Sequence, residues 1–471
     1  MALAFHNTLS RRREVFEPLR PGKVSLYVCG ITVYDRCHVG HARSLIFFDA
    51  VVRFLRWRGY EVNFVRNVTD IDDKIITRAA EEGVPWDALA HRYTESMHAD
   101  LDALGCLPPD VEPRATDHIE EMHALISTLE ERGLAYKVAS GDVFYSTGDY
   151  KPYGLLSGRN LEDLLAGARV DIDTRKKSPM DFALWKSSRE GEPCWPSPWG
   201  EGRPGWHLEC SAMSTKYLGQ PFDIHGGGED LVFPHHENEL AQSAGASDGE
   251  FVRYWLHHAF VRINEEKMSK SLGNVFAIED LLREVEAEGL RLHLLSTHYR
   301  SPLDFSPDGI GESTRALLRV YETIARAEEA GLAAGALARD HPAAANLLEV
   351  MDDDLNTARA VAIAFDSMRE ANRALDAGDR GSAESAVAVL KTAGACLGLF
   401  GRPAGSFLDA YRRQRASSSG VDEAEVERMI AERKAARERH DFEEADRIRD
   451  QLAASGIVLE DGPEGTTWRT A

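Results

Sequence analysis

The sequence has no uninterrupted apolar stretch of about eighteen residues, which is the length that a membrane-spanning helix requires. Three arginines at residues 11–13 have no apolar core beside them, so a secretory signal is not expected at the amino terminus. Cysteine is scarce. Six cysteines in 471 residues are too few for a disulfide scaffold. We therefore expect a cytoplasmic protein in which some thiols are metal ligands or core residues.

Basic residues are also fewer than acidic residues. The chain has 55 lysines and arginines against 77 aspartates and glutamates, a net charge of −22 with a pI near 5.3. This balance argues against indiscriminate binding of nucleic acid, which usually requires a basic domain. A large acidic protein can still have a local basic face that binds phosphates. The negative charge on the rest of its surface would then discourage nonspecific association.

The length excludes a single compact core. A chain of 471 residues is expected to form two to four domains of roughly 100–200 residues each. Hydrophobic residues at 43% and charged residues at 28% are ordinary for folded proteins, so the composition does not indicate disorder.

The first ordered pattern predicts a β-α-β unit. Residues 24–28 form an apolar run suited to a buried strand, and apolar residues then recur at helical spacing from Leu45 to Leu55. A second strand-like run covers residues 62–68, so the unit should open a parallel sheet. The polar stretch after the first strand then lies at a strand's carboxyl end, where such sheets bind ligands.

That polar stretch contains a candidate phosphate site. Gly40 lets a ligand approach the backbone, while His38 and His41 place two imidazoles in the first turn of the helix. Free N–H groups at a helix start suit a nucleotide phosphate. The pattern G-x-G-x-x-G is absent here, which argues against a redox dinucleotide. On this motif alone, ordinary helix-start residues are an equally good interpretation.

A second polar loop follows the second strand at residues 67–75. Residues 70–73 are good caps for a helix predicted over residues 75–82, and Thr69 lies where a ligand pocket would have its wall. We expect Thr69 to line the pocket and the aspartates to be mainly structural.

Residues 108–205 read as an insertion between the two halves of a Rossmann-like fold. Helical and strand-like segments at residues 118–132 and 143–146 precede turns that are rich in Gly, Pro and Trp. The tryptophans of these turns would form either a stacking surface or, more commonly, the insertion's own small core.

Residues suited to binding a ligand at the end of a predicted strand occur again later in the chain. Residues 226–228 are glycines expected to turn after a short strand, and Asp230 suits a ribose hydroxyl. Pro234 fits the first position of a helix, which puts His235 and Glu239 one turn apart on one face. That pair is either half of a metal site or an ordinary surface pair.

Two cysteines lie near these segments, Cys29 at the first strand's end and Cys210 at the mouth of a later helix. Zinc takes thiolates, imidazoles and sometimes a carboxylate, so Cys29, Cys210, His235 and Glu239 are the candidate ligands. Their dispersal over three segments is weaker evidence than a paired C-x-x-C motif. We interpret the remaining cysteines as structural: Cys37, Cys106, Cys194 and Cys396.

Residues 264–274 read as a flexible loop. Lys267 and Lys270 stand three apart among serines and ahead of a glycine, so they can wrap a polyphosphate and move as a lid. A solvated surface loop is the alternative, but the unusual string KMSKS favours the functional interpretation.

The strings HVGH at residues 38–41 and KMSKS at residues 267–271 together resemble the signatures of class I aminoacyl-tRNA synthetases. Neighbouring segments narrow the resemblance to the cysteinyl-tRNA synthetases and cover the chain almost end to end. Val39, Ile31 and Glu265 depart from the commonest family residues without removing a chemical group. The matching segments are CGITVYD (29–35), NVTDIDDK (67–74), DFALWK (181–186), GRPGWHLEC (202–210), FPHHENE (233–239) and HYRSPLDF (298–305).

The resemblance implies that ATP, with Mg²⁺, activates L-cysteine to cysteinyl-adenylate and that cysteine is then transferred to tRNA(Cys). It also implies one zinc ion per chain, held by the four candidate ligands, that binds the substrate thiolate and so selects cysteine over serine. The site residues that it implies are His38, His41, Lys267 and Lys270 for catalysis, Gly40, Asp230 and Lys270 for ATP, and Thr69 and Trp206 for cysteine.

The remainder of the chain resembles the family's tRNA-binding part. We expect helical structure over residues 281–298, a helical bundle over 342–399, a polar linker over 412–420, and two charged helices followed by a hairpin around Asp461-Gly462. The expected domains are a Rossmann-like α/β catalytic domain (1–275) with its insertion, a stem-contact region (276–340), the helical bundle (341–401) and a small mixed anticodon-binding domain (402–471).

Two other functions share some of these features. A cysteine ligase of the mycothiol pathway would join cysteine to an amino sugar, but such relatives generally lack the C-terminal tail present here. A non-catalytic zinc- and RNA-binding paralogue would not need the intact His38, His41, Lys267 and Lys270. The resemblance also suggests a monomer without a membrane partner.

Overall fold

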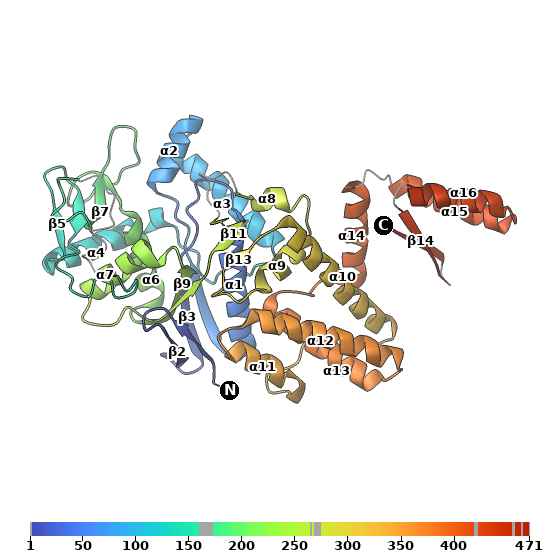
Figure 1. Ribbon diagram of the computed structural model, residues 1–471. Helices are drawn as coiled ribbons and strands as arrows, with labels where there is room; N and C mark the ends of the chain where they lie inside the picture. Colours follow the sequence, from blue (N-terminus) through green and yellow to red (C-terminus); the bar gives the residue numbers. More distant parts are fainter. Residues whose placement is uncertain are drawn as a thin grey trace.

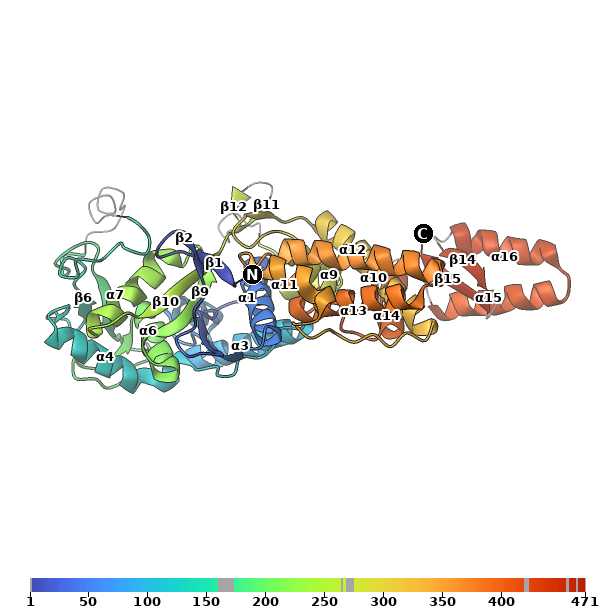
Figure 2. The ribbon, with the colours of Figure 1, turned by 90° about the horizontal axis from the view of Figure 1, so that it is seen from below.

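The computed structural model describes residues 2–159, 173–263, 266–267, 275–418, 423–454, 457–462 and 465–470. Its parts follow one another along an elongated molecule: an inserted unit, a parallel sheet, a helical bundle, and a small unit at the far end (Figure 1; Figure 2). None of the helices in these ranges has the length and apolar character needed to cross a bilayer.

A parallel sheet is formed by strands between residues 23 and 258, in the order β10-β9-β3-β4. Its strands read as apolar runs because helices cover the sheet and bury most of their residues. The predicted α/β fold class is confirmed, although the second strand ends at Arg66 rather than at residue 68. The strands are β3 (Lys23–Val28), β4 (Glu61–Arg66), β9 (Phe222–Gly228) and β10 (Val252–His258).

Three helices and a hairpin complete this unit. Helix α1 (Val39–Trp57) connects β3 to β4 and buries Ile46, Ala50 and Phe54, which recur at helical spacing. Its amino terminus therefore lies at the carboxyl ends of the strands. The other elements are the hairpin β1 (Ala4–Asn7) and β2 (Arg12–Val15), and the helices α6 (Trp206–Leu218) and α7 (Glu237–Ala246).

The predicted insertion has an antiparallel sheet of its own, in the order β5-β6-β7-β8. Trp185 and Trp199 are buried beside Leu129 in a core cluster that also includes Tyr27 and Trp255 of the parallel sheet, so part of the Trp-rich segment packs in a core shared with that sheet. The elements between β4 and α6 are α2 (Asp73–Glu82), α3 (Trp86–Ala103), a 3₁₀ turn (Ala115–His118), α4 (Ile119–Glu131), β5 (Ala135–Lys137), β6 (Val143–Tyr145), β7 (Phe182–Ser187) and β8 (Gly202–Pro204).

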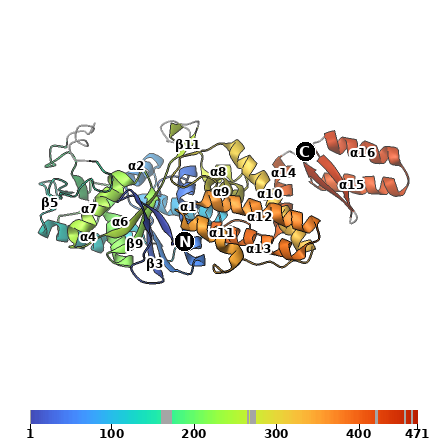
Figure 3. The ribbon, with the colours of Figure 1, turned by 60° about the horizontal axis from the view of Figure 1, so that its bottom comes forward.

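Helices dominate the chain after β10, and three of them pack as the predicted bundle beside α1 (Figure 3). The helical structure expected over residues 281–298 is present only in part, because α8 (Ile278–Leu281) ends where it should begin and α9 (Ala287–Leu295) covers the middle. The remaining elements are β11 (Val261–Ile263), β12 (Glu266–Lys267), β13 (Leu303–Asp304), α10 (Pro307–Glu329), a 3₁₀ turn (Pro342–Ala344), α11 (Ala345–Asp352), α12 (Thr357–Asp376) and α13 (Arg380–Leu397).

The linker predicted over residues 412–420 is also wrong where it can be compared, because α14 (Ala404–Ser418) is a helix. Phe407 is fully buried and stacks on Tyr321 of α10, with the ring centroids 3.9 Å apart. This apolar anchor lies N-terminal to the polar residues that suggested a linker. Tertiary packing of one side chain therefore explains why the segment joins the bundle.

The C-terminal unit contains the predicted pair of helices and a hairpin, and it projects from the body beyond α14 (Figure 1). Asp461 and Gly462 do not form the hairpin turn, because they pair with Thr466 and Gly465 inside the ladder. The unit comprises α15 (Glu423–Glu438), α16 (Phe442–Ala454), β14 (Ile457–Gly462) and β15 (Gly465–Thr470).

Candidate functional site

A cavity of about 330 Å³ opens at the carboxyl ends of β3 and β9, beside the first turn of α1. This is the edge at which the sequence predicts a ligand. Residues from five separate segments meet there, because parallel strands end at the same side of a sheet. Among the predicted site residues, its lining includes Cys29, His38, Gly40, His41, Trp206 and Asp230.

The two histidines of the first signature lie together at the start of α1. The rings of His38 and His41 are stacked, with centroids 3.7 Å apart, and the backbone N–H of His38 donates to His41 Nδ1 at 3.2 Å. This contact orients His41 at the helix terminus, where backbone N–H groups and the helix dipole favour an anion. Both side chains line the cavity beside this terminus.

The glycines at residues 226–228 do not form the predicted turn, since β9 continues through all three. They allow close packing instead. A Cβ atom added to Gly226 would lie 2.3 Å from the Phe48 ring of α1, and one on Gly228 would lie 2.4 Å from Asp230 Oδ1. Small residues therefore let α1 and Asp230 approach the strand at the cavity.

The four predicted zinc ligands come together in one buried cluster. Donor atoms of Cys29, Cys210, His235 and Glu239 all lie within 4.8 Å of one another. Cys29 Sγ lies 3.5 Å from Cys210 Sγ and 3.3 Å from Glu239 Oε1, and His235 Nε2 lies 3.0 Å from the same oxygen. Two thiols, an imidazole and a carboxylate at these separations form a donor set that suits zinc.

The route by which His235 reaches the cluster differs from the prediction. Pro234 does not begin a regular helix: residues 232–236 form a short distorted turn, and α7 starts at Glu237. His235 therefore precedes the helix that carries Glu239, yet the two side chains still meet. The i, i+4 spacing of His235 and Glu239 predicted their contact correctly. The reason was only partly right, because the two residues do not share one regular helix.

The electrostatics of the cluster are set by its burial. Burial together with Cys210 and Glu239 raises the pKa of Cys29 well above its usual value. Although burial opposes ionisation of Cys210, hydrogen bonds from Cys29 and His235 lower its pKa to about 6. Burial likewise opposes charge on His235, but Glu239 and Cys210 raise its pKa to about 10. One cysteine is thus prepared as a thiolate, the form that binds metal.

Further histidines surround the cluster. His225 Nε2 lies 2.8 Å from Glu239 Oε2, and His207 Nδ1 lies 3.0 Å from His235 Nδ1. Cys29, His225, His236 and Glu239 form a second possible donor group, which shares two members with the first. Only the first group contains two thiols, and soft thiolate ligands favour zinc.

The two predicted cysteine-pocket residues, Trp206 and Thr69, have different surroundings. Trp206 stacks on His235 with ring centroids 4.3 Å apart, and it lines the cavity. Thr69 is buried, and its hydroxyl accepts a hydrogen bond from Asn67 Nδ2 at 3.1 Å. Asp70 and Asp72 have the expected structural roles, since Asp70 accepts from Thr116 and Asp72 caps α2.

Sequence reasoning missed Asn67, which contacts Gly30, Thr69 and Cys210. Its Oδ1 accepts from the Gly30 backbone N–H at 2.8 Å and lies 3.7 Å from Cys210 Sγ. A Cβ atom on Gly30 would lie 1.6 Å from the carbonyl oxygen of Asn67. The Cys-Gly pair at residues 29–30 offers the only sequence signal, because glycine permits this close backbone contact.

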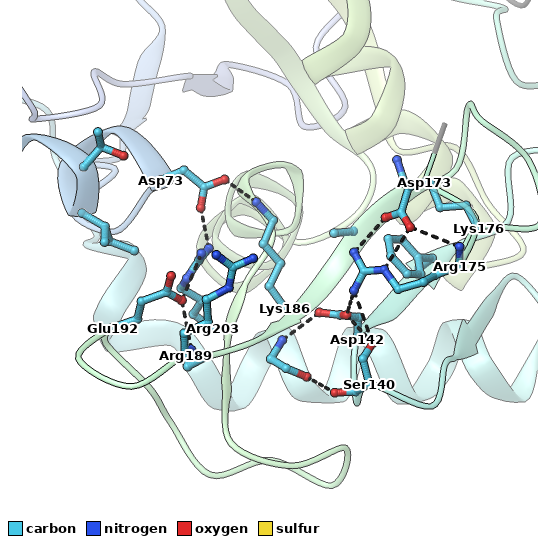
Figure 4. A pocket seen from close by; sticks show the side chains of 16 residues that line it. Asp73, Ser140, Asp142, Asp173, Arg175, Lys176, Lys186, Arg189, Glu192 and Arg203 are labelled. Carbon is cyan, nitrogen blue, oxygen red and sulfur yellow. Dashed lines mark hydrogen bonds and ion pairs between the residues drawn. The ribbon is translucent and has the colours of Figure 1, made fainter. Parts of the chain in front are cut away.

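A second cavity, of about 590 Å³, lies between α2 and the sheet of the insertion (Figure 4). Its charged side chains largely pair with one another. Asp73 forms ion pairs with Lys186 at 2.5 Å and with Arg203 at 2.6 Å, while Arg175 pairs with Asp142. These contacts connect α2 to the strand that leads into Trp206.

The lysine loop is described only in part. Lys270 lies outside the described residues, and Lys267 is described only as backbone, in β12, where it pairs with Arg262 of β11.

Comparisons with known proteins agree on one family. Family models match for the "tRNA synthetases class I (C) catalytic domain" (residues 15–315), the "DALR domain" (347–401) and the "Cysteinyl-tRNA ligase anticodon binding domain" (423–469). The chain is 54% identical to proteins named cysteine–tRNA ligase from Alkalilimnicola ehrlichii and Halorhodospira halophila, with 99% of each chain covered.

Solved structures support the fold at lower identity. Methionyl-tRNA synthetase of Mycobacterium tuberculosis, in complex with methionyl-adenylate, superposes with a TM-score of 0.62 at 18% identity, covering 82% of this chain and 93% of that one. A leucyl-tRNA synthetase of Agrobacterium radiobacter gives a TM-score of 0.56 at 13% identity, covering 81% and 83%.

Proposed function

The chain belongs to the cysteine–tRNA ligases, a family of class I aminoacyl-tRNA synthetases, and from this premise we propose that it joins L-cysteine to tRNA(Cys) through a cysteinyl-adenylate made from ATP. The observation that carries the proposal is the buried cluster of Cys29, Cys210, His235 and Glu239 beside the first turn of α1. A site that would bind a thiol through its metal thus adjoins a helix terminus that would bind phosphates, and this adenylate contains both groups.

The nucleotide half of the site would act by electrostatic stabilisation. His38 and His41 face the cavity at the start of α1, where charge develops on the phosphates as the cysteine carboxylate attacks. Gly40 leaves room for the nucleotide beside the helix, and Asp230 is placed to accept from a ribose hydroxyl. Lys267 and Lys270 would contact the phosphates from the lysine loop, with Mg²⁺ accompanying ATP.

The amino-acid half of the site would select its substrate through zinc held by the four clustered residues. When bound there, zinc would supply a soft ligand position for the substrate thiolate, for which a serine hydroxyl is a poorer partner. Trp206 would cover the substrate side of His235, on which it stacks, and Thr69 would fix the opposite wall through Asn67.

The later parts of the chain would bind tRNA(Cys). We assign residues 1–275 to catalysis, with the insertion at 108–205, residues 276–340 to stem contact, 341–401 to the bundle and 402–471 to the anticodon end. The elongated arrangement supports this division, because the C-terminal unit lies at the far end of the molecule from the parallel sheet (Figure 2). The protein would act as a monomer.

Two assays test the proposal on the full-length protein. Cysteine-dependent exchange of pyrophosphate into ATP reports adenylate formation, and charging of tRNA(Cys) reports transfer. We expect both activities, with serine inactive in the exchange. Exchange without charging, together with coupling of cysteine to an amino sugar, would show that the chain performs the ligase reaction of its nearest rival instead.

A further inference from the structure

A line of hydrogen bonds runs from Cys29 to the amino-terminal hairpin. His236 Nε2 lies 3.3 Å from Cys29 Sγ, and His236 Nδ1 lies 2.7 Å from His257 Nε2. His257 Nδ1 in turn lies 2.8 Å from the hydroxyl oxygen of Thr8. Both histidines are buried, whereas Thr8 is only half-buried at the end of β1. The line therefore connects a candidate metal ligand to the edge of the molecule.

The direction of every bond in this line follows from the direction of the first. A neutral imidazole has one N–H donor and one acceptor nitrogen, so each ring passes on the direction that it receives. A metal-bound cysteine is a thiolate, which accepts hydrogen bonds. His236 then donates from Nε2 and accepts at Nδ1 from His257 Nε2–H. His257 Nδ1 must accept as well, and Thr8 supplies the hydroxyl that donates to it.

The surroundings hold the two ends of this line in place. A Cβ atom on Gly227 would lie 2.8 Å from Cε1 of His236, so the strand packs closely against that ring. The backbone N–H of Thr8 donates to the Trp255 carbonyl at 2.9 Å, independently of the Thr8 side chain. Removing the hydroxyl should therefore change the hydrogen bonding of His257 while the hairpin keeps its position.

We propose that Thr8 is a positioning residue for the metal site: its hydroxyl fixes His257 and His236 in the tautomers that point an N–H group at Cys29. The inference rests on the proposed zinc site. Without the hydroxyl, the opposite tautomers become accessible, and these would direct the lone pair of His236 Nε2 at the thiolate sulfur. Hydrogen-bond partners of metal ligands typically contribute about 10–100-fold to metal affinity, so we expect an effect near the lower end, about tenfold.

Zinc affinity of the full-length protein tests this, measured by competition with a chromogenic chelator. Thr8→Val should weaken zinc binding about tenfold, because valine keeps the branched shape and lacks the hydroxyl, and Thr8→Ala should do the same. Thr8→Ser should restore the wild-type affinity. With Co²⁺ in place of zinc, the thiolate-to-metal charge-transfer band should shift in the valine variant and remain unshifted in the serine variant.

Ser10→Ala provides the matched control on the same hairpin, since Ser10 is exposed and accepts from the Arg12 backbone N–H. It should leave both readouts unchanged. If the wild-type protein holds one zinc ion and Thr8→Val binds it equally well with an unshifted Co²⁺ band, the positioning role is wrong. A wild-type protein that binds no zinc would instead overturn the metal site of the proposed function, and this inference with it.

Discussion

The buried cluster around Cys29 and the C-terminal unit at residues 423–470 use charged side chains in opposite ways. Glu239 is completely buried, and its two oxygens contact His225 and His235 at 2.8 and 3.0 Å. Arg428 of α15 pairs with Glu432 at 2.5 Å while 54% of its side chain stays exposed. Buried charges depend on their partners, whereas exposed pairs contribute only about 0–1 kcal/mol. The first region should be sensitive to single changes, and the second keeps its charges available to a partner.

The region between these two shows a third use of charge. Asp352 at the end of α11 is buried and binds Arg58 through two hydrogen bonds of 2.7 and 3.0 Å. Two residues on, Asp354 accepts from Tyr299 Oη and from the His6 backbone N–H. These contacts attach the helical bundle to the unit that contains the sheet. The bundle is therefore part of the molecular body, whereas the C-terminal unit is joined to it through α14.

The largest effect is expected from Cys210→Ser. Losing a thiolate ligand should abolish stoichiometric zinc and reduce cysteine-dependent pyrophosphate exchange by more than about 100-fold, beyond the range typical of residues outside the ligand set. Elemental analysis of the purified protein measures the zinc. Cys194→Ser is the matched control, because Cys194 is exposed and should leave zinc at about one per chain. Undiminished zinc in Cys210→Ser would favour the second donor group, which contains His225 and His236.

The next effect concerns the phosphate side of the cavity. His41→Asn should slow adenylate formation by about 10²–10³-fold with little change in cysteine affinity, because an electrostatic donor acts mainly in the transition state. Lys270→Ala should behave in the same way. Single-turnover kinetics separate the two quantities, and His91→Asn, an exposed histidine of α3, is the control. Equal losses of rate and affinity would point to ground-state binding instead.

A truncation tests the C-terminal unit, which is the second of the two regions compared above. Ending the chain after Ser418 removes the C-terminal unit but retains α14 with its buried Phe407. Pyrophosphate exchange should stay within about twofold of the full-length value, while charging of tRNA(Cys) should fall about tenfold or more, because remote binding energy serves only the tRNA-dependent step. Steady-state kinetics on one tRNA preparation measure both. A cut near Gly401 would be a poorer test, since it also exposes the core around Tyr321.

The smallest effect is expected at an exposed ion pair of α15. Arg428→Ala should leave the free energy of unfolding unchanged within the error of the measurement, because its side chain is already solvated. Asp352→Ala is the contrasting variant and should cost about 3 kcal/mol or more, since it removes a buried carboxylate that accepts two hydrogen bonds from Arg58. Urea titration followed by circular dichroism compares the two. Similar losses in both variants would contradict the distinction drawn between the regions.

Local patterns in the sequence were sufficient for much of this protein. The apolar run before Cys29 and the periodic residues of α1 predicted the β-α-β unit, because burial alone sets those spacings. The same reasoning found the bundle and the C-terminal helices. The strings HVGH and KMSKS indicated the family, which the full-length relatives then established.

Other features depended on contacts between distant segments. The glycines of β9 were predicted as a turn, because nothing local records that Phe48 and Asp230 pack against them. Residues 412–420 were predicted as a linker, although their described part, to Ser418, belongs to a helix that Phe407 anchors on α10. The hairpin turn was misplaced for a related reason, since cross-strand register decides whether Asp461 and Gly462 pair. Local propensity is a weak guide wherever tertiary packing opposes it.

The sequence by itself determined which residues are chemically able to form the site, since thiols, imidazoles and carboxylates are recognisable anywhere in a chain. Only the tertiary structure decided which of them meet. Cys29 and Glu239 are separated by more than two hundred residues, yet they lie 3.3 Å apart because β3 and β9 are neighbours in the sheet. The contacts of Asn67, His225 and Thr8 follow from the same pairing of distant segments. Donor chemistry is a property of single residues, whereas the geometry of a site is a property of the packed strands and helices that position them.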